Sequence, residues 1–102
     1  MKFGMTDAQY EILKRLVIDP LKSQGAEVFI FGSRATGKNH PHSDVDLLYK
    51  MQGQAQISSR VLSDIKEAIE ESNFPFTVEI VADQNLAASY RKNVESSMTL
   101  IS

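Results

Sequence analysis

The chain has 102 residues, of which 42% are hydrophobic and 24% are charged, and this composition is typical of one folded domain over residues 1–102 and argues against intrinsic disorder. It has no cysteine, which excludes disulfides and thiolate zinc sites, and its formal net charge of −2 argues against a nucleic-acid partner. No apolar run reaches the roughly 20 residues that a membrane span requires, so we expect a cytoplasmic protein without a membrane partner.

The first predicted elements are a helix and a buried strand. Thr6–Gln9 is typical of a helix N-terminus, and apolar residues recur at helical spacing over residues 7–23. Pro20 lies inside this range and is expected to kink the helix or end it early. The run Val28–Phe31 is too short for a helix and rich in strand formers, so it predicts a buried strand.

Three further elements follow a loop over residues 32–43, within which Arg34–Thr36 could form a single helical turn. Ser43–Lys50 alternates between a polar-to-apolar face and an apolar face, which predicts a second strand. Ile57–Ser72 carries apolar residues along one side and predicts a helix. Phe76–Val81 alternates again and predicts a third strand.

From Asp83 onward, loosely periodic apolar residues predict a short helix and a tail whose position the pattern does not give. The order is therefore helix, strand, strand, helix, strand, helix. It predicts an α+β fold of two layers, in which a small mixed sheet of three or more strands has helices packed on one face.

Two short patterns flank the loop. Gly32 and Ser33 end the first strand, and Asp44 and Asp46 open the second after ten intervening residues. A small turn after a buried strand offers backbone N–H groups and a hydroxyl to a polyphosphate. Side chains two positions apart on a strand point to one face, so the two carboxylates repel each other unless cations intervene. Together the patterns predict a site for a nucleotide with magnesium.

Magnesium takes hard oxygen ligands, and in two-metal phosphoryl transfer two ions about 3.5 to 4 Å apart share carboxylates with the phosphates of the substrate. A third carboxylate would come from the adjacent strand, where Glu79 is the candidate and Asp83 the fallback. The predicted catalytic and metal-binding residues are Asp44, Asp46 and Glu79, and the predicted nucleotide-binding residues are Gly32, Ser33 and Arg34.

Other interpretations of these segments are weaker. Residues 32–39 approach the P-loop pattern, but Asn39 stands where that loop needs Ser or Thr. An EF-hand starting at Asp44 would need glycine and glutamate where the chain has Tyr49 and Ala55. Taken alone, two acids on a strand are more often a solvated edge. Lys38 is expected to be a solvated loop residue, and His40 and His42 to be loop surface rather than zinc ligands.

The Gly32-Ser33 turn, the ten-residue spacing, the Asp44-x-Asp46 pair and a later strand acid resemble the nucleotidyltransferase superfamily that includes DNA polymerase β. At this length the chain is similar to the minimal nucleotidyltransferases, the antitoxin partners of HEPN-domain toxins. The resemblance covers about four fifths of the chain and implies a palm-like fold. Family members commonly have Asp as the third acid, whereas this chain has Glu79.

The resemblance also implies a function. The Gly32 turn and Ser33 would hold the β and γ phosphates of ATP, Asp44 and Asp46 would bind two Mg²⁺ ions, and Glu79 would help to deprotonate the acceptor. The reaction would move AMP from ATP to a tyrosine hydroxyl of a HEPN-type toxin, with pyrophosphate leaving, and we expect a hetero-oligomer with that toxin. The alternative is a non-catalytic antitoxin that neutralises its partner by binding alone.

Overall fold

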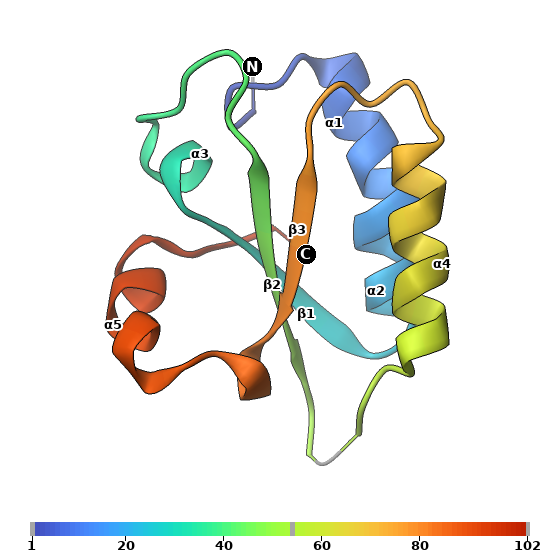
Figure 1. Cartoon of the computed structure of the whole chain (residues 1–102), viewed down its shortest axis with the longest axis vertical. Coiled ribbons are helices and arrows are strands. Elements are labelled where there is room, and N and C mark those ends of the chain that lie inside the picture. Colours follow the sequence, from blue (N-terminus) through green and yellow to red (C-terminus); the bar gives the residue numbers. More distant parts are fainter. Residues whose placement is uncertain (1, 54, 102) are drawn as a thin grey trace.

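Four strands form one mixed sheet in the computed structural model, which describes residues 2–53 and 55–101 (Figure 1). The strands are β1 (Ala26–Phe31), β2 (Val45–Met51), β3 (Val78–Ala82) and β4 (Thr99–Leu100). They are ordered β3-β2-β1-β4, with β2 antiparallel to β1 and parallel to β3, and with β4 antiparallel to β1. The predicted α+β fold with a small mixed sheet is confirmed.

The helical elements lie on both sides of this sheet. They are α1 (Asp7–Leu13), the π-helical turn η1 (Lys14–Ile18), α2 (Asp19–Ser23), α3 (Ser33–Thr36), α4 (Ser59–Glu70), the 3-10 turn η2 (Asp83–Asn85) and α5 (Ala88–Ser97). The helices α1, α2 and α4 pack on one face, while α3 and α5 lie on the other side (Figure 1). Within the described ranges, no helix has the length and apolar character needed to cross a bilayer.

The first helix runs through Pro20 without ending there. It starts with a capping box, in which the Thr6 hydroxyl accepts from the Gln9 backbone N–H and the Gln9 side chain accepts from the Thr6 N–H. Immediately before Pro20 the helix widens into η1, where the Asp19 N–H donates to the Lys14 carbonyl. Pro20 has no N–H to donate and lies in the first turn of α2, where that loss is tolerated.

The core lies between the sheet and the face covered by α1, α2 and α4. Leu47 stands at its centre on β2, fully buried, with Ile30 of β1 and Ile80 of β3 as its register partners. The helices contribute buried side chains at helical spacing, namely Leu13, Val17, Leu21, Ile65 and Ile69. The alternation predicted for the second strand is thus confirmed, with Val45, Leu47 and Tyr49 on the core side.

The tail, which the sequence pattern does not place, returns to the sheet. After α5, the two-residue strand β4 pairs with β1, with Leu100 opposite Phe29. Two residues are too few to show the alternation that marks a strand in the sequence. The strand β4 forms because β1, about 70 residues earlier in the chain, supplies its hydrogen-bond partners.

Leu47→Ala should lower the free energy of unfolding by about 3 to 5 kcal/mol, because it leaves a cavity in the central strand. Urea denaturation measures this effect. Glu67→Ala on the exposed side of α4 is the control and should stay within about 0.5 kcal/mol of wild type. Equal losses in the two variants would contradict the placement of the core.

Candidate active site

The strand register brings two of the predicted acids together. Asp46 on β2 pairs with Phe31 on β1 and with Glu79 on β3, so the three side chains form one row across the sheet. Register partners point to the same face, and their side chains lie within reach of each other. This is the face opposite the core, on which α3 and α5 also lie (Figure 1).

The Gly32 turn lies directly against the same row. Gly32 has φ 78° and ψ −157°, a backbone conformation that is essentially restricted to glycine. A Cβ atom built at this position would lie 2.6 Å from Asp46 Oδ2. Only glycine therefore lets the end of β1 approach the Asp46 carboxylate this closely.

Ser33 follows as the first residue of α3. The Ala35 and Thr36 N–H groups donate to the Gly32 carbonyl, at 3.1 and 3.3 Å. The N–H groups ahead of these two, at the very start of the helix, have no acceptor within the helix. The start of α3 and the Ser33 hydroxyl thus directly follow Gly32, the residue whose backbone closely approaches Asp46.

Asp46 is partly buried among like charges. Burial raises the pKa of its carboxyl, and the negative charges of Asp44 and Glu79 raise it further. Asp44 and Glu79 are themselves exposed. The three predicted acids therefore interact electrostatically, with Asp46 as the common member.

This donor set fits magnesium. Carboxylate oxygens are the ligands that Mg²⁺ prefers, and the pKa of Asp46 is raised first by burial and then by the charges of Asp44 and Glu79, which a bound cation would offset. Over residues 2–53 and 55–101, however, no three His, Cys, Asp or Glu side chains are gathered closely enough to hold a metal by themselves. Phosphate oxygens of the substrate would have to supply the remaining ligands.

Arg34 points into the protein rather than out toward this face. Its side chain is 2% exposed, and Nε and Nη2 donate to the Ser43 carbonyl at 3.1 and 2.8 Å, while Nη1 donates to the Phe3 carbonyl at 2.8 Å. Its guanidinium carbon lies 4.1 Å from the centre of the Phe76 ring. A nucleotide contact by Arg34 stays a prediction, and the observed partners of its guanidinium belong to the protein.

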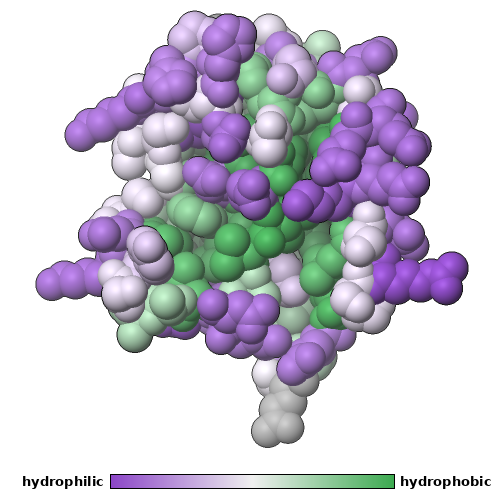
Figure 2. Space-filling model, viewed as in Figure 1, coloured by the Kyte–Doolittle hydropathy of each residue, from purple (hydrophilic) through white to green (hydrophobic). Residues whose placement is uncertain are grey.

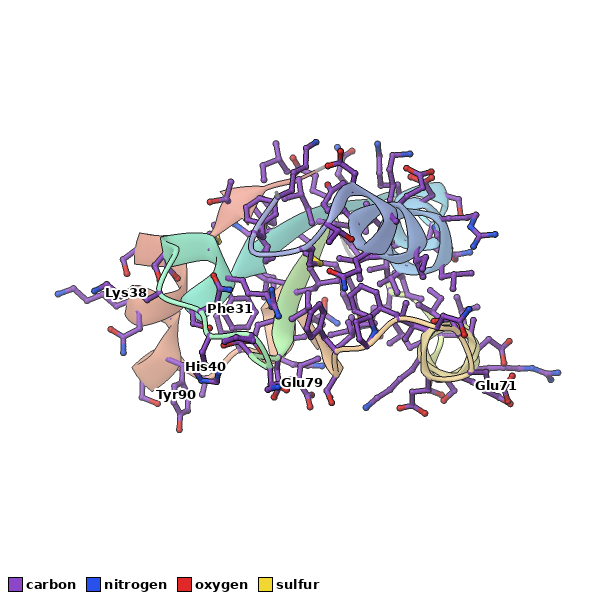
Figure 3. The ribbon with its side chains drawn as sticks, turned by 90° about the horizontal axis from the view of Figure 1, so that it is seen from above. Phe31, Lys38, His40, Glu71, Glu79 and Tyr90 are labelled. Atoms are coloured by element: carbon purple, nitrogen blue, oxygen red, sulfur yellow. The ribbon has the colours of Figure 1, made fainter. Side chains whose placement is uncertain are left out.

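Asp83, the fallback for the third acid, lies away from the acidic row. Asp83 follows the far end of β3, roughly 13 Å along the strand direction from Glu79 at about 3.3 Å per residue, and it forms an ion pair with Arg91 at 3.0 Å. Glu79 is thus the acid that the register places beside Asp46. Lys38 extends away from the loop (Figure 3), and His40 and His42 are exposed.

Apolar surface accompanies the acids on this side of the sheet. Phe29, Phe31 and Val81 share the face of Asp46 and Glu79 and are only partly buried. Figure 2 shows an apolar hollow in the middle of the view, bordered by polar side chains. A separate cavity of about 480 Å³, lined by Lys2, Phe3, Tyr10, Leu100 and Ile101, contains none of the predicted site residues.

Sequence reasoning misses two contributions to this region. The pattern predicts Phe31 only as part of a buried strand, although the strand register sets it beside Asp46. Nothing in the sequence connects residues 2–5, before the first helix, with the loop, yet the Phe3 carbonyl binds Arg34. The only local signal is Gly4, whose need for a positive φ becomes apparent once the structure is known.

Comparison with known families gives one clear match. The family described as "Polymerase beta, Nucleotidyltransferase" matches residues 21–102, which include every residue of the predicted site. A comparison with curated proteins gave no match.

Three solved structures share the fold. A toxin-antitoxin complex with AMP-PNP is 16% identical, with a TM-score of 0.65, and the match covers 85% of this chain and 70% of that chain. A mutant of the MntA-HpeT toxin-antitoxin, with Asp-to-Glu replacements two positions apart, is 13% identical with a TM-score of 0.64 and the same coverage, 85% and 70%. A protein from Sulfolobus solfataricus, assigned as a nucleotidyltransferase, is 21% identical with a TM-score of 0.52, over 98% and 86%. At these low sequence identities, the TM-scores show a common fold and nothing beyond it.

Asp46→Asn should stabilise the metal-free protein. Because the folded state raises the pKa of Asp46, folding favours the protonated carboxyl, and the wild type loses stability as pH rises from the unfolded value near 4 through the folded pKa. In EDTA at pH 7 the variant should melt a few degrees higher, and this difference should shrink as pH falls toward about 4. Asp64→Asn, on the exposed side of α4, should show no such pH-dependent difference. A lower Tm for Asp46→Asn at pH 7 would contradict the prediction.

Gly32→Ala should lower the free energy of unfolding by more than about 2 kcal/mol, because the new Cβ meets both a forbidden backbone conformation and Asp46 Oδ2. Gly37→Ala is the comparison. Gly37 has φ 77° and ψ 8°, and a Cβ atom at this position would have nothing within 4 Å, so the cost should be about 1 to 2 kcal/mol. Urea denaturation measures both values, and a smaller loss for Gly32→Ala than for Gly37→Ala would count against the close approach.

Proposed function

Because this chain belongs to the polymerase beta nucleotidyltransferase family, we propose that it transfers AMP from ATP to a tyrosine hydroxyl of a HEPN-type toxin and so acts as an antitoxin. The observation that carries this proposal is the meeting of the Gly32 turn with the Asp46–Glu79 pair. A phosphate-binding turn and paired carboxylates on one sheet face are the two parts that nucleotidyl transfer requires.

Each residue has a role in this proposal. The Gly32 turn and Ser33 hold the β and γ phosphates, and Asp44 and Asp46, with Glu79, bind two magnesium ions. Bound magnesium supplies charge neutralisation at the phosphates and activation of the acceptor oxygen. Glu79 assists removal of the proton from the acceptor hydroxyl. The acceptor oxygen then bonds to the α phosphorus, and the bond from that phosphorus to pyrophosphate breaks.

The toxin partner is proposed from the structural comparisons. Two of the structures with this fold are toxin-antitoxin assemblies, and one of these was determined with AMP-PNP, an analogue of ATP. The mutant assembly replaces two aspartates at the spacing that separates Asp44 from Asp46. These parallels favour ATP as donor and a toxin as acceptor, in a hetero-oligomer.

A second candidate is an antitoxin that neutralises its partner by binding alone. It is favoured by the finding that the described acids and histidines do not form a preassembled group of three around a metal. It is also favoured by glutamate at position 79, where the family commonly has aspartate. Under this second candidate function, the acidic row is a remnant of a catalytic site.

Intact-mass spectrometry of a co-expressed HEPN-type toxin, incubated with this chain, ATP and Mg²⁺, separates the two. We expect the toxin to gain the mass of one or more AMP groups, and Asp44→Asn to slow the transfer by roughly 100-fold or more. Asp64→Asn on α4 is the matched control and should transfer AMP at the wild-type rate. EDTA should abolish AMP transfer by the wild type and by Asp64→Asn.

The outcomes are distinct. Toxin neutralisation without any added mass, retained by the double variant Asp44→Ala with Asp46→Ala, would establish neutralisation by binding. Added AMP that persists unchanged in Asp44→Asn would remove this carboxylate from the chemistry.

A further inference from the structure

Arg34 is a buried cation without a carboxylate partner among the described ion pairs. Its three hydrogen bonds all end on backbone carbonyls, two on Ser43 and one on Phe3. Burial lowers the pKa of its guanidinium, while the charge of Asp44 acts in the opposite direction. A guanidinium can donate to two carbonyls from different segments at once, because its N–H groups are fixed in one plane.

The first carbonyl belongs to the residue before Asp44. Ser43 is buried, its N–H donates to the His40 carbonyl, and its hydroxyl accepts from the His40 N–H. The end of the loop is thus closed on itself and fastened to Arg34. Since Arg34 directly follows Ser33, one side chain ties the phosphate-binding turn to the start of the acidic pair.

The second carbonyl belongs to a strained turn at the N-terminus. Lys2 and Met5 exchange backbone hydrogen bonds of 3.1 and 2.8 Å, and the two residues between them have φ values of 53° and 76°. Phe3 is the only residue other than glycine, in the described part of the chain, with a positive φ. Strain of this kind persists where surrounding contacts hold it, and here the turn presents the Phe3 carbonyl to Arg34.

The third contact reaches the segment that leads into β3, the strand that carries Glu79. The guanidinium stacks on Phe76, with 4.1 Å from its carbon to the ring centre, and Phe76 precedes Glu79 by three residues. Arg34 therefore contacts the segments that lead into the acidic pair and into Glu79, and it adjoins the Gly32 turn in sequence.

We propose that Arg34, braced by the turn at Phe3 and Gly4, is a positioning residue that fixes the Ser33 turn, Asp44 and Glu79 relative to one another. This inference rests on the proposed function for its consequence in catalysis. It assigns Arg34 an action through the protein, in place of the nucleotide contact expected from the sequence.

Gly4 offers a way to disturb the brace without changing Arg34. A Cβ at Gly4 would clash with Asn39 Nδ2 and lie 2.9 Å from Arg34 Nη1. Gly53 is the matched control, because it also has a positive φ, 65°, but nothing lies within 4 Å of a Cβ at its position. Both Gly→Ala changes carry a backbone cost, and only Gly4→Ala sets a methyl group against Asn39 and the guanidinium.

The test is native-state hydrogen exchange of the full chain without ATP or metal, on Arg34→Lys, Gly4→Ala and Gly53→Ala. The amides of His40, Ser43 and Val45 should exchange at least tenfold faster in the first two variants than in Gly53→Ala, while the amides of α4 should not differ among the three. Should either variant fail to fold, Phe76→Leu replaces it, with an acceleration of about threefold expected at the same amides. Acceleration spread evenly over all elements would overturn the proposal, because Arg34 would then act only on global stability.

A kinetic measurement separates positioning from nucleotide binding. In the AMP-transfer reaction, Arg34→Lys and Gly4→Ala should both lower kcat at least tenfold, with KM for ATP within threefold of the Gly53→Ala value. A raised KM in Arg34→Lys, with Gly4→Ala like Gly53→Ala and unchanged exchange, would assign Arg34 to the nucleotide instead. If the wild type transfers no AMP, the proposed function fails, while the exchange experiment still decides whether Arg34 fixes the loop.

Discussion

The candidate site depends on the register of β2 between β1 and β3. Leu47 packs into the core between Ile30 and Ile80, and this fixes which residues stand opposite each other one position earlier. A slip of one residue would turn Leu47 outward and Asp46 inward, at the cost of burying a carboxylate among apolar side chains. The apolar core therefore determines that Asp46 and Glu79 lie side by side on the opposite face.

This arrangement places like-charged carboxylates close together, which lowers the stability of the folded protein. The carboxylates of Asp44 and Glu79 act on Asp46, and burial raises the pKa of Asp46 without being offset by a nearby cationic side chain. The one buried arginine close to the loop, in the described part of the chain, is bonded to carbonyls, so its charge is not paired with Asp46. Such concentrated negative charge is typical of sites that bind cations, because the cation provides the compensation that the free protein lacks.

Much of this could be predicted from the sequence, and the reasons are local. The helix from Asp7, the strand at Val28–Phe31 and the alternation around Leu47 follow from periodicity, and the Gly32 and Asp44-x-Asp46 patterns mark the candidate site by composition. The strand β4, the register that sets Glu79 rather than Asp83 beside Asp46, and the inward course of Arg34 depend on segments distant in the chain. The local sequence Gly32-Ser33-Arg34 is the same whether the arginine faces a nucleotide or a buried carbonyl, so the sequence alone does not distinguish the two.

The contacts of Arg34 also explain why the spacing between Ser33 and Asp44 is informative. A free loop of ten residues would tolerate insertions at little entropic cost, since loop closure depends only weakly on length. Here the loop is fastened at both ends, by α3 at one and by the two hydrogen bonds from Arg34 to the Ser43 carbonyl at the other. An inserted residue would have to be accommodated between these two fixed ends. The relative position of Ser33 and Asp44 is therefore set by the hydrogen bonds of the guanidinium and by the strand register, rather than by the flexibility of the chain.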